Sequence, residues 1–289
     1  MTDDSSLTMV LSGGGSLGAI QVGMLRALAE AGIQPTAVVG TSVGSINGLV
    51  VAGHAALADA AEQLDGVWRR LTRARVYPAS VRGLIQALRG KRNHIFEQRG
   101  IREILLTEQP HRTFEDLALP FAAVAADVLT AEEVVFDSGD VIEAVLASSA
   151  LPGIYPPVRH GGHLCVDGGV ASHTPISQAV DRGASRIIVL STGFSCALGA
   201  APATALGMAV HSLNLIQTSQ LLRDRETFGG ACRISLVAPP CPQPISAGTF
   251  DEAPRLIADG YAAAKHWLDA HGLDDLDHIP CGLEPHGHP

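Results

Sequence analysis

A short apolar run that ends in a glycine–serine turn constrains the fold of this chain more than any other feature. Residues 37–39 (Ala-Val-Val) are typical of a buried strand, and residues 40–44 then read Gly-Thr-Ser-Val-Gly. Apolar residues recur with helical spacing from Ile46 to Ala52. This order predicts an elbow between strand and helix that presents the hydroxyl of Ser42 as a nucleophile. The pentapeptide alone also fits an ordinary strand-to-helix turn, so the prediction needs support from elsewhere in the chain.

The N-terminal segment has a similar pattern. Residues 8–11 predict a strand, 13–18 form a glycine-rich turn, and a helical stripe runs from Ile20 to Gly32. Together with the strand at 37–39, this β-α-β start favours a mostly parallel sheet with helices on its faces. We expect further strands at 121–127, 132–136, 164–166, 186–190 and 233–237, and further helices at 141–147, 205–222 and 253–268.

The composition is that of a globular chain with a substantial core. Of its 289 residues, 46% are hydrophobic and 17% are charged. We expect one domain over residues 1–272 and a loose tail at 273–289. No apolar run reaches the roughly 18–20 residues of a membrane span, and the acidic N-terminus does not resemble a secretory signal. The five cysteines include no C-x-x-C pair, so we expect no disulfide framework, no metal site and a cytoplasmic location.

Positive charge is concentrated in one segment. Half of the 20 lysines and arginines lie between Arg69 and Arg102, where Glu97 is the only acid, although the net charge of the chain is −9. This segment belongs to a helical insertion that we expect at about 59–109. One interpretation is a set of solvated helix faces. The other is a lid whose arginines contact an anionic membrane surface peripherally, while Trp68, Leu84 and Leu88 face acyl chains.

Three glycine turns each follow an expected strand, and they are Gly13–Gly15, Gly40–Gly44 and Asp167–Gly169. Because the carboxyl ends of parallel strands meet at one edge of a sheet, we expect the three turns to converge. A serine nucleophile needs a proton acceptor and hydrogen-bond donors for the oxyanion. The bare amides of the first turn could be those donors, and Asp167 could accept the proton of Ser42. A Ser-His-Asp triad would need a histidine late in the chain, and none of the 12 histidines lies in a turn that singles it out.

Four motifs taken together resemble the patatin-like phospholipase family. They are G-G-G-x-x-G at 13–18, G-x-S-x-G at 40–44, the run A-S-S-A-L-P-G-I-Y-P-P at 147–157, and D-G-G at 167–169. The resemblance covers about Met9 to Leu190. It implies a three-layer α/β/α sandwich fold. It also implies an enzyme that hydrolyses acyl esters of lipids, with no metal or organic cofactor.

The resemblance also implies a role for each motif residue. Ser42 would be the nucleophile and Asp167 its sole side-chain partner, in a dyad without histidine. Gly13, Gly14 and Gly15 would supply the oxyanion hole. The turns would be supported by Gly18, Gly40, Gly44, Gly168 and Gly169.

Two positions depart from the family pattern. Leu17 stands where the family often has Lys or Arg, and His173 stands where it often has Asn. One interpretation of His173 is a hydrogen-bonding substitute that steadies the Asp167 turn. The other is a histidine that assists proton transfer.

Other functions fit parts of the sequence. The first glycine turn also satisfies the dinucleotide fingerprint, but the acid that should follow the second strand is replaced by Gly40-Thr41-Ser42, and no G-K-[ST] phosphate loop exists. A general carboxylesterase, a thioesterase and a non-catalytic lipid-binding module stay open. The expected partner is a lipid ester and not a nucleic acid. The sequence does not predict the oligomeric state.

Overall fold

The computed structural model describes residues 6–78, 81–193, 201–230, 232–237, 239–240 and 248–271, so the expected tail at 273–289 lies outside the described residues. Eight strands form one sheet in the order β5-β6-β3-β2-β1-β7-β8, and β4 pairs with β3. The strands are β1 (Thr8–Leu11), β2 (Ala37–Thr41), β3 (Phe121–Asp127), β4 (Glu133–Phe136), β5 (Val158–His160), β6 (His163–Asp167), β7 (Arg186–Leu190) and β8 (Arg233–Val237). The five neighbours β3, β2, β1, β7 and β8 run parallel.

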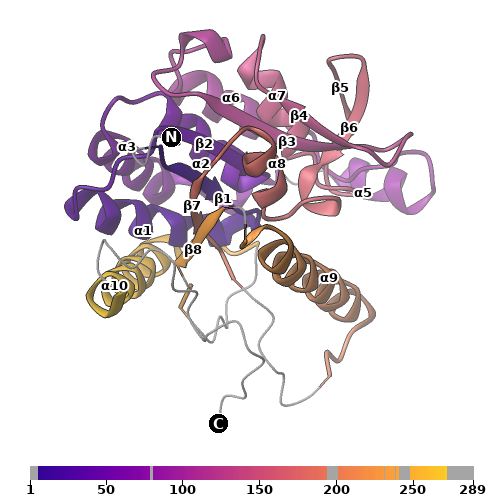
Figure 1. Cartoon of the computed structure of the whole chain (residues 1–289). Coiled ribbons are helices and arrows are strands. Elements are labelled where there is room, and N and C mark those ends of the chain that lie inside the picture. The colour runs from indigo at the N-terminus through magenta and orange to yellow at the C-terminus, as the bar shows by residue number, and fades with distance from the viewer. Residues whose placement is uncertain are drawn as a thin grey trace.

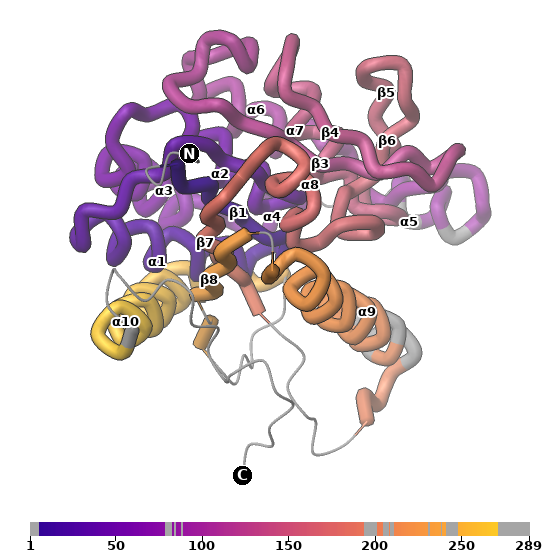
Figure 2. The backbone as a smooth tube through the Cα atoms, in the orientation of Figure 1, coloured from indigo at the N-terminus to yellow at the C-terminus, as the bar shows by residue number. Residues whose placement is uncertain are grey.

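Helices cover both faces of this sheet, so the fold is a three-layer α/β/α sandwich (Figure 1). The helices are α1 (Gly18–Glu30), α2 (Val43–Ala52), α3 (Leu57–Arg70), α4 (Arg73–Val76), α5 (Val81–Leu88), α6 (Arg99–Glu108), α7 (Val141–Ser148), α8 (Ile176–Asp181), α9 (Ala205–Phe228) and α10 (Ala253–His271). The tube in Figure 2 shows α10 and α9 as separate rods below the strands. The two predicted C-terminal helices are confirmed, and both extend beyond the predicted ends.

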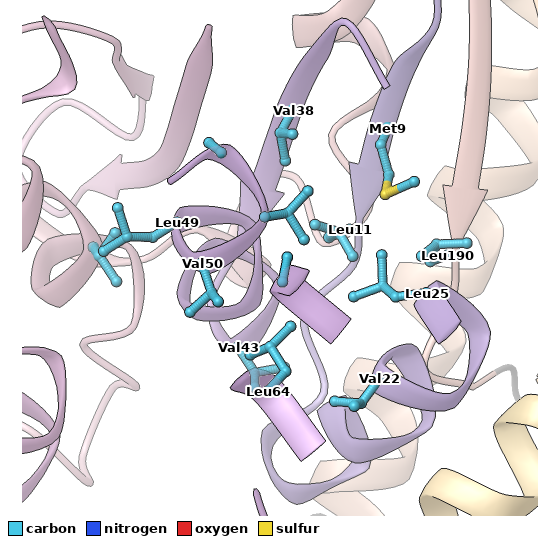
Figure 3. Close-up of a cluster of buried hydrophobic side chains, with 14 of the residues drawn as sticks. Met9, Leu11, Val22, Leu25, Val38, Val43, Leu49, Val50, Leu64 and Leu190 are labelled. Atoms are coloured by element: carbon cyan, nitrogen blue, oxygen red, sulfur yellow. The ribbon is translucent and has the colours of Figure 1, made fainter. Parts of the chain in front are cut away.

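The alternation of side chains along the strands produces the layers. Met9 and Leu11 of β1 belong to the larger core cluster, which α1, α2, α3, α7 and α10 cover. Val10 belongs to a second cluster on the other face, to which α8 and α9 contribute Ile176 and Leu221. Figure 3 shows part of the larger cluster, where strand and helix side chains meet. Because both faces are buried, these strands read as continuous apolar runs in the sequence.

The direction of β6 differs from the expectation of parallel strands. This strand runs antiparallel to β3, and its last residue Asp167 pairs with Ala125. Thr41 at the end of β2 pairs with Val124, the residue before Ala125. The longer strand β3 therefore extends beyond the end of β2, and β6 returns along that extension until it reaches the level of Ser42. The three glycine turns converge as predicted. However, the third turn follows an antiparallel strand, so the rule that the carboxyl ends of parallel strands meet at one edge does not explain its position.

The segment between α2 and β3 is helical, as its sequence predicts. Within its described residues it contains α3, α4, α5 and α6 and no strand, although His94 makes one isolated bridge to Gly153. The interpretation of Trp68 as a lipid-facing side chain is wrong, because Trp68 is 3% exposed and belongs to the core. The side chains of Leu84 and Leu88 lie outside the described part of the structure. Among the helices described, none is both long enough and apolar enough to cross a bilayer.

Candidate active site

Ser42 lies at the tip of a strained elbow between β2 and α2. Its backbone has φ 55° and ψ −126°, a conformation that costs free energy for any residue with a Cβ. Both glycines of the motif are needed for close packing. A Cβ on Gly40 would lie 2.3 Å from the carbonyl oxygen of Gly44, and a Cβ on Gly44 would lie 2.1 Å from the carbonyl oxygen of Leu11. The elbow is therefore possible only with glycine two residues before and two residues after the serine.

The Ser42 hydroxyl meets the Asp167 carboxylate across 125 residues of sequence. Ser42 Oγ donates a hydrogen bond of 2.5 Å to Asp167 Oδ2, and the N–H of Gly169 donates one of 2.8 Å to Asp167 Oδ1. Burial raises the pKa of Asp167 to about 6, although the hydrogen bonds from Ser42 and Gly169 favour the ionised form. A carboxylate with this pKa is ionised at neutral pH and is a stronger proton acceptor than an ordinary aspartate.

The first glycine turn packs directly beside the elbow. A Cβ on Gly13 would lie 3.4 Å from Ser42 Cβ. The N–H of Gly13 donates to the carbonyl oxygen of His173 at 3.0 Å, so this amide is already occupied, contrary to the expectation for an oxyanion donor. Gly14 and Gly15 have φ angles of 146° and 60° and are partly exposed. Among the described residues, no acceptor is found for the N–H groups of Gly14 and Gly15.

Three further glycines of the motifs lie where an added Cβ would be in close contact with neighbouring atoms. A Cβ on Gly18 would lie 2.5 Å from Val43 Cγ2, and a Cβ on Gly168 would lie 2.2 Å from the carbonyl oxygen of Val124. A Cβ on Gly169 would lie 3.0 Å from Asp167 Oδ1. Side chains at these positions would push the glycine turns away from the elbow and from β3.

His173 lies beside the first glycine turn. The ring atoms Cδ2 and Nε2 would be 3.1 and 3.2 Å from a Cβ on Gly13, and Nδ1 lies 3.5 Å from Thr174 Oγ1. Burial lowers the pKa of His173 to about 4, so its imidazole is neutral at physiological pH. Its carbonyl oxygen, which accepts from Gly13, connects the Asp167 turn to the first glycine turn.

The last residue of α7 and the loop that follows it contact both members of the Ser42–Asp167 pair, a role that the sequence did not reveal. Ser148 Oγ accepts a hydrogen bond of 3.0 Å from the N–H of Ser42 and donates one of 2.6 Å to the carbonyl oxygen of Val124. The carbonyl oxygen of Ala150 accepts from the N–H of Asp167 at 2.9 Å. The only signal for this role was the match of residues 147–157 to the family motif.

A buried polar network supports the first glycine turn from behind. Gln21 Nε2 donates to the carbonyl oxygens of Ser12 and Leu190, each at 3.0 Å. Asn47 Nδ2 donates to the carbonyl oxygen of Gly18 at 3.0 Å and to Gln21 Oε1 at 2.9 Å. The indole N–H of Trp68 donates to Asn47 Oδ1 at 3.0 Å. Both ends of the glycine turn are therefore tied to α2, the helix that follows Ser42.

Two side chains outside the motifs approach the carboxylate. Burial, and to a smaller extent the charge of Asp167, raises the pKa of Tyr77, which lies at the end of α4 and stacks on Tyr155 with ring centroids 5.8 Å apart. Gln217 of α9 donates from Nε2 to the carbonyl oxygen of Gly169 at 3.1 Å. Nothing in the sequence patterns of α4 or α9 identified these neighbours.

The site is equipped for nucleophilic chemistry without a metal ligand set. In the described part of the chain, no group of three or more His, Cys, Asp or Glu side chains is placed to hold a metal ion. A nucleophile, a proton acceptor and two free amides are the groups that acyl transfer needs.

Known proteins are similar to this chain in sequence. Patatin-like phospholipase domain-containing protein 7 from Mus musculus is 30% identical over 198 residues, which are 67% of this chain and 14% of that protein. Lysophospholipase NTE1 from Cryptococcus neoformans is 33% identical over 192 residues, 64% of this chain and 11% of that protein. The chain thus spans about a seventh or less of the length of these relatives.

One similar solved structure is that of human GIVD cytosolic phospholipase A2 in complex with methyl gamma-linolenyl fluorophosphonate. Its alignment with this chain has a TM-score of 0.49 and 12% sequence identity, and it includes 94% of this chain and 58% of that chain. The family model described as patatin-like phospholipase matches residues 9–180. Because this match includes more than half of the chain and all four motifs, the chain belongs to the patatin-like phospholipase family.

Proposed function

We propose that this protein is a serine hydrolase that cleaves carboxylic ester bonds of lipids, with phospholipids or lysophospholipids as its substrates. The hydrogen bond from Ser42 Oγ to Asp167 Oδ2, made at the tip of a strained elbow, carries the proposal. The names of the relatives support the substrate class, since one is a lysophospholipase and another contains a patatin-like phospholipase domain. We also expect a cytoplasmic location, as the cysteine pattern predicts.

In the proposed reaction, Ser42 Oγ attacks the ester carbonyl carbon as its proton passes to Asp167. An aspartate with an ordinary pKa of about 4 is a weak base for an alcohol. Burial, which raises the pKa of Asp167 to about 6, reduces this disadvantage. The tetrahedral intermediate then collapses to an acyl-serine, and the leaving alcohol takes the proton from Asp167. A water molecule hydrolyses the acyl-serine by the same steps with Asp167 again accepting a proton.

The negative charge on the carbonyl oxygen has to be stabilised by groups that are already in place. The N–H groups of Gly14 and Gly15 are the donors that we assign to this oxyanion hole. Each such donor contributes about 3–4 kcal/mol to transition-state stabilisation in other serine hydrolases. Gly13 has a different role, because its N–H holds the carbonyl oxygen of His173 and so fixes the turn.

Labelling with a fluorophosphonate probe tests this proposal. We expect the probe to attach to the peptide that contains Ser42, and we expect turnover of lysophosphatidylcholine and of a p-nitrophenyl ester. Ser42→Ala should lower both rates about a thousandfold or more. Ser138→Ala, which changes an exposed serine outside the site, is the control. Labelling of a different residue, or wild-type protein that hydrolyses neither ester, would contradict the proposal.

A further inference from the structure

Gly169 provides one of the two hydrogen bonds that hold the Asp167 carboxylate. Its N–H donates to Asp167 Oδ1 at 2.8 Å, while Ser42 Oγ donates to Oδ2. A Cβ on Gly169 would lie 3.0 Å from Oδ1, so only a glycine fits here without a shift. Glycine also has the largest backbone freedom of all residues, so its N–H could easily turn away from the carboxylate. The bond to Oδ1 therefore depends on a second contact that fixes Gly169.

A side chain of α9 makes that contact. Gln217 Nε2 donates to the carbonyl oxygen of Gly169 at 3.1 Å. The same nitrogen would lie 3.6 Å from a Cβ on Gly169, the position that is 3.0 Å from Asp167 Oδ1. The glutamine amide and the aspartate carboxylate therefore both lie beside Gly169. Because the amide holds its carbonyl oxygen and the carboxylate accepts from its N–H, a rotation of this glycine would break a hydrogen bond.

One face of α9 is fixed against the loop that follows Asp167. Gln220 Nε2 donates to the carbonyl oxygen of Ala171 at 2.6 Å, and Leu221 is 5% exposed in the core on this side of the sheet. Positions i, i+3 and i+4 lie on one face of a helix, so Gln217 points to the same side as these two residues. Figure 1 shows one end of α9 against the rest of the molecule near α8. The glutamine amide is therefore presented by a helix that packing already holds in place.

The other contacts of this loop act on its two ends. The N–H of Asp167 donates to the carbonyl oxygen of Ala150 at 2.9 Å. Thr41 Oγ1 donates to the carbonyl oxygen of Ser172, also at 2.9 Å. Gly169 lies between these ends, so the bond from α9 is the one that reaches the residue in contact with the carboxylate.

We propose that Gln217 is a positioning residue of the active site, which fixes Gly169 so that the N–H of this glycine orients the Asp167 carboxylate toward Ser42. This inference rests on the proposed function, because that carboxylate is the group assigned to accept the proton in ester cleavage. The family model matches residues 9–180, so α9 lies outside the match and none of the four motifs includes this glutamine. Gln217 acts through Gly169 and not on the substrate itself.

Loss of the bond from Gly169 would have two effects. This bond lowers the pKa of Asp167 and so opposes the effect of burial, which means that the pKa rises when the bond is lost. The carboxylate would also be freer to rotate away from Ser42, which lowers the rate of the chemical step. Tyr77 and His173 also approach the site, but burial raises the pKa of the first and lowers that of the second to about 4, so neither is charged near pH 7.

Gln217→Met tests the inference, and Gln220→Met is the matched control on the same helix. Each substitution removes one amide that donates to the loop, keeps an unbranched side chain and adds no charge. In Gln217→Met we expect the pH midpoint of kcat/KM to rise by about 0.5–1 unit. We also expect kcat at pH 8 to fall about tenfold, with KM within about twofold of wild type. Gln220→Met, whose lost bond goes to Ala171, should keep the midpoint and should keep kcat within about threefold.

Carbon-13 NMR of the Asp167 carboxyl measures the same midpoint without turnover, and Asp167→Asn identifies its signal. A protein that hydrolyses no ester contradicts the proposed function, whereas a midpoint that rises only in Gln217→Met still supports the contact from Gln217 to Gly169. An unchanged midpoint in Gln217→Met overturns the inference. An equal rise in both variants also overturns it, because the cause would then be a general loosening of α9. Gln217→Asn, whose amide is one methylene too short, should give the same rise, and urea titration verifies that each variant is folded.

Discussion

The backbone N–H of Ser42 donates a 3.0 Å hydrogen bond to the hydroxyl of Ser148, which lies 106 residues later in the chain. Ser148 is fully buried, and its own hydroxyl donates to the carbonyl oxygen of Val124 at 2.6 Å. One side chain therefore connects the strained elbow to the neighbouring strand β3. The elbow of this protein is held by a residue outside the elbow motif.

Ser148→Ala should lower kcat about 10- to 100-fold with little change in KM, because the elbow loses the contact that orients Ser42. It should also cost about 1–3 kcal/mol in the free energy of unfolding, since two buried backbone groups lose their partner. Ser149→Ala is the matched control. It removes a neighbouring buried hydroxyl that donates to the carbonyl oxygen of Val145 at 2.8 Å and does not touch Ser42. If both variants react with a fluorophosphonate at the wild-type rate, Ser148 does not position the nucleophile.

The sequence predicts those parts of the site that local chemistry dictates. Gly40 and Gly44 allow the Ser42 elbow by removing Cβ atoms within a few residues of it, so a short motif is sufficient to find it. The direction of β6 could not be predicted, because strand pairing is decided by long-range contacts and the short run before Asp167 fits either direction. Trp68 illustrates the same limit. Its position in a basic segment suggested exposure. In the structure its indole N–H donates to the buried Asn47 Oδ1, and this distant partner allows the side chain to lie in the core.

The rate of ester hydrolysis should depend on the ionisation of Asp167. Burial raises the pKa of this carboxyl to about 6, and only the ionised form can accept the proton of Ser42. We expect kcat/KM to be constant above about pH 7 and to fall about tenfold per pH unit well below pH 6. A pH profile of a p-nitrophenyl ester in wild-type protein measures this. A midpoint near pH 4 would mean that the carboxyl titrates like an exposed aspartate.

The same shift predicts that Asp167→Asn stabilises the fold at high pH. The pKa of Asp167 is higher in the folded than in the unfolded chain, so its proton stabilises the fold below about pH 4. That stabilisation is lost as the pH rises through about 6. The amide keeps no charge, so the variant should exceed wild type in unfolding free energy by about 2–3 kcal/mol at pH 8 and by less at pH 4.5.

Urea titrations of both proteins at the two pH values check this prediction. Asp127→Asn provides a control of opposite sign, since the N–H of Leu129 and then His163 lower the pKa of Asp127. This variant should lose stability at pH 8. Equal unfolding free energies of wild type and Asp167→Asn at both pH values would show that the ionised Asp167 carboxylate does not destabilise the fold.

His173→Asn should retain activity within about threefold of wild type. The imidazole is neutral because burial lowers its pKa to about 4, and its known link to the first glycine turn is its backbone carbonyl, which the substitution keeps. The pH midpoint near 6 should also stay, because we assign it to Asp167. Measurement of kcat/KM against pH in the variant decides between the two interpretations of this histidine. A loss of rate as large as that of Asp167→Asn, or the disappearance of the midpoint, would identify His173 as a proton carrier.

Asn47→Leu tests whether the network behind the first glycine turn sets the geometry of the oxyanion donors. The substitution keeps a branched side chain but removes the donor to the Gly18 carbonyl oxygen, the donor to Gln21 Oε1 and the acceptor of the Trp68 indole N–H. We expect a cost of about 2–4 kcal/mol in unfolding free energy and a fall in kcat that exceeds the change in KM, because Gly14 and Gly15 lie between the two tied ends of the turn.

Trp68→Phe is the comparison that separates the two effects. It removes only the indole N–H and leaves both bonds donated by Asn47 to Gly18 and Gln21 in place. It should therefore lose stability but keep kcat within about threefold. The same fall in kcat in both variants would mean that activity follows stability alone. A fall in kcat confined to Asn47→Leu would show that activity depends on the Asn47 side-chain amide, which joins Gln21 to Gly18.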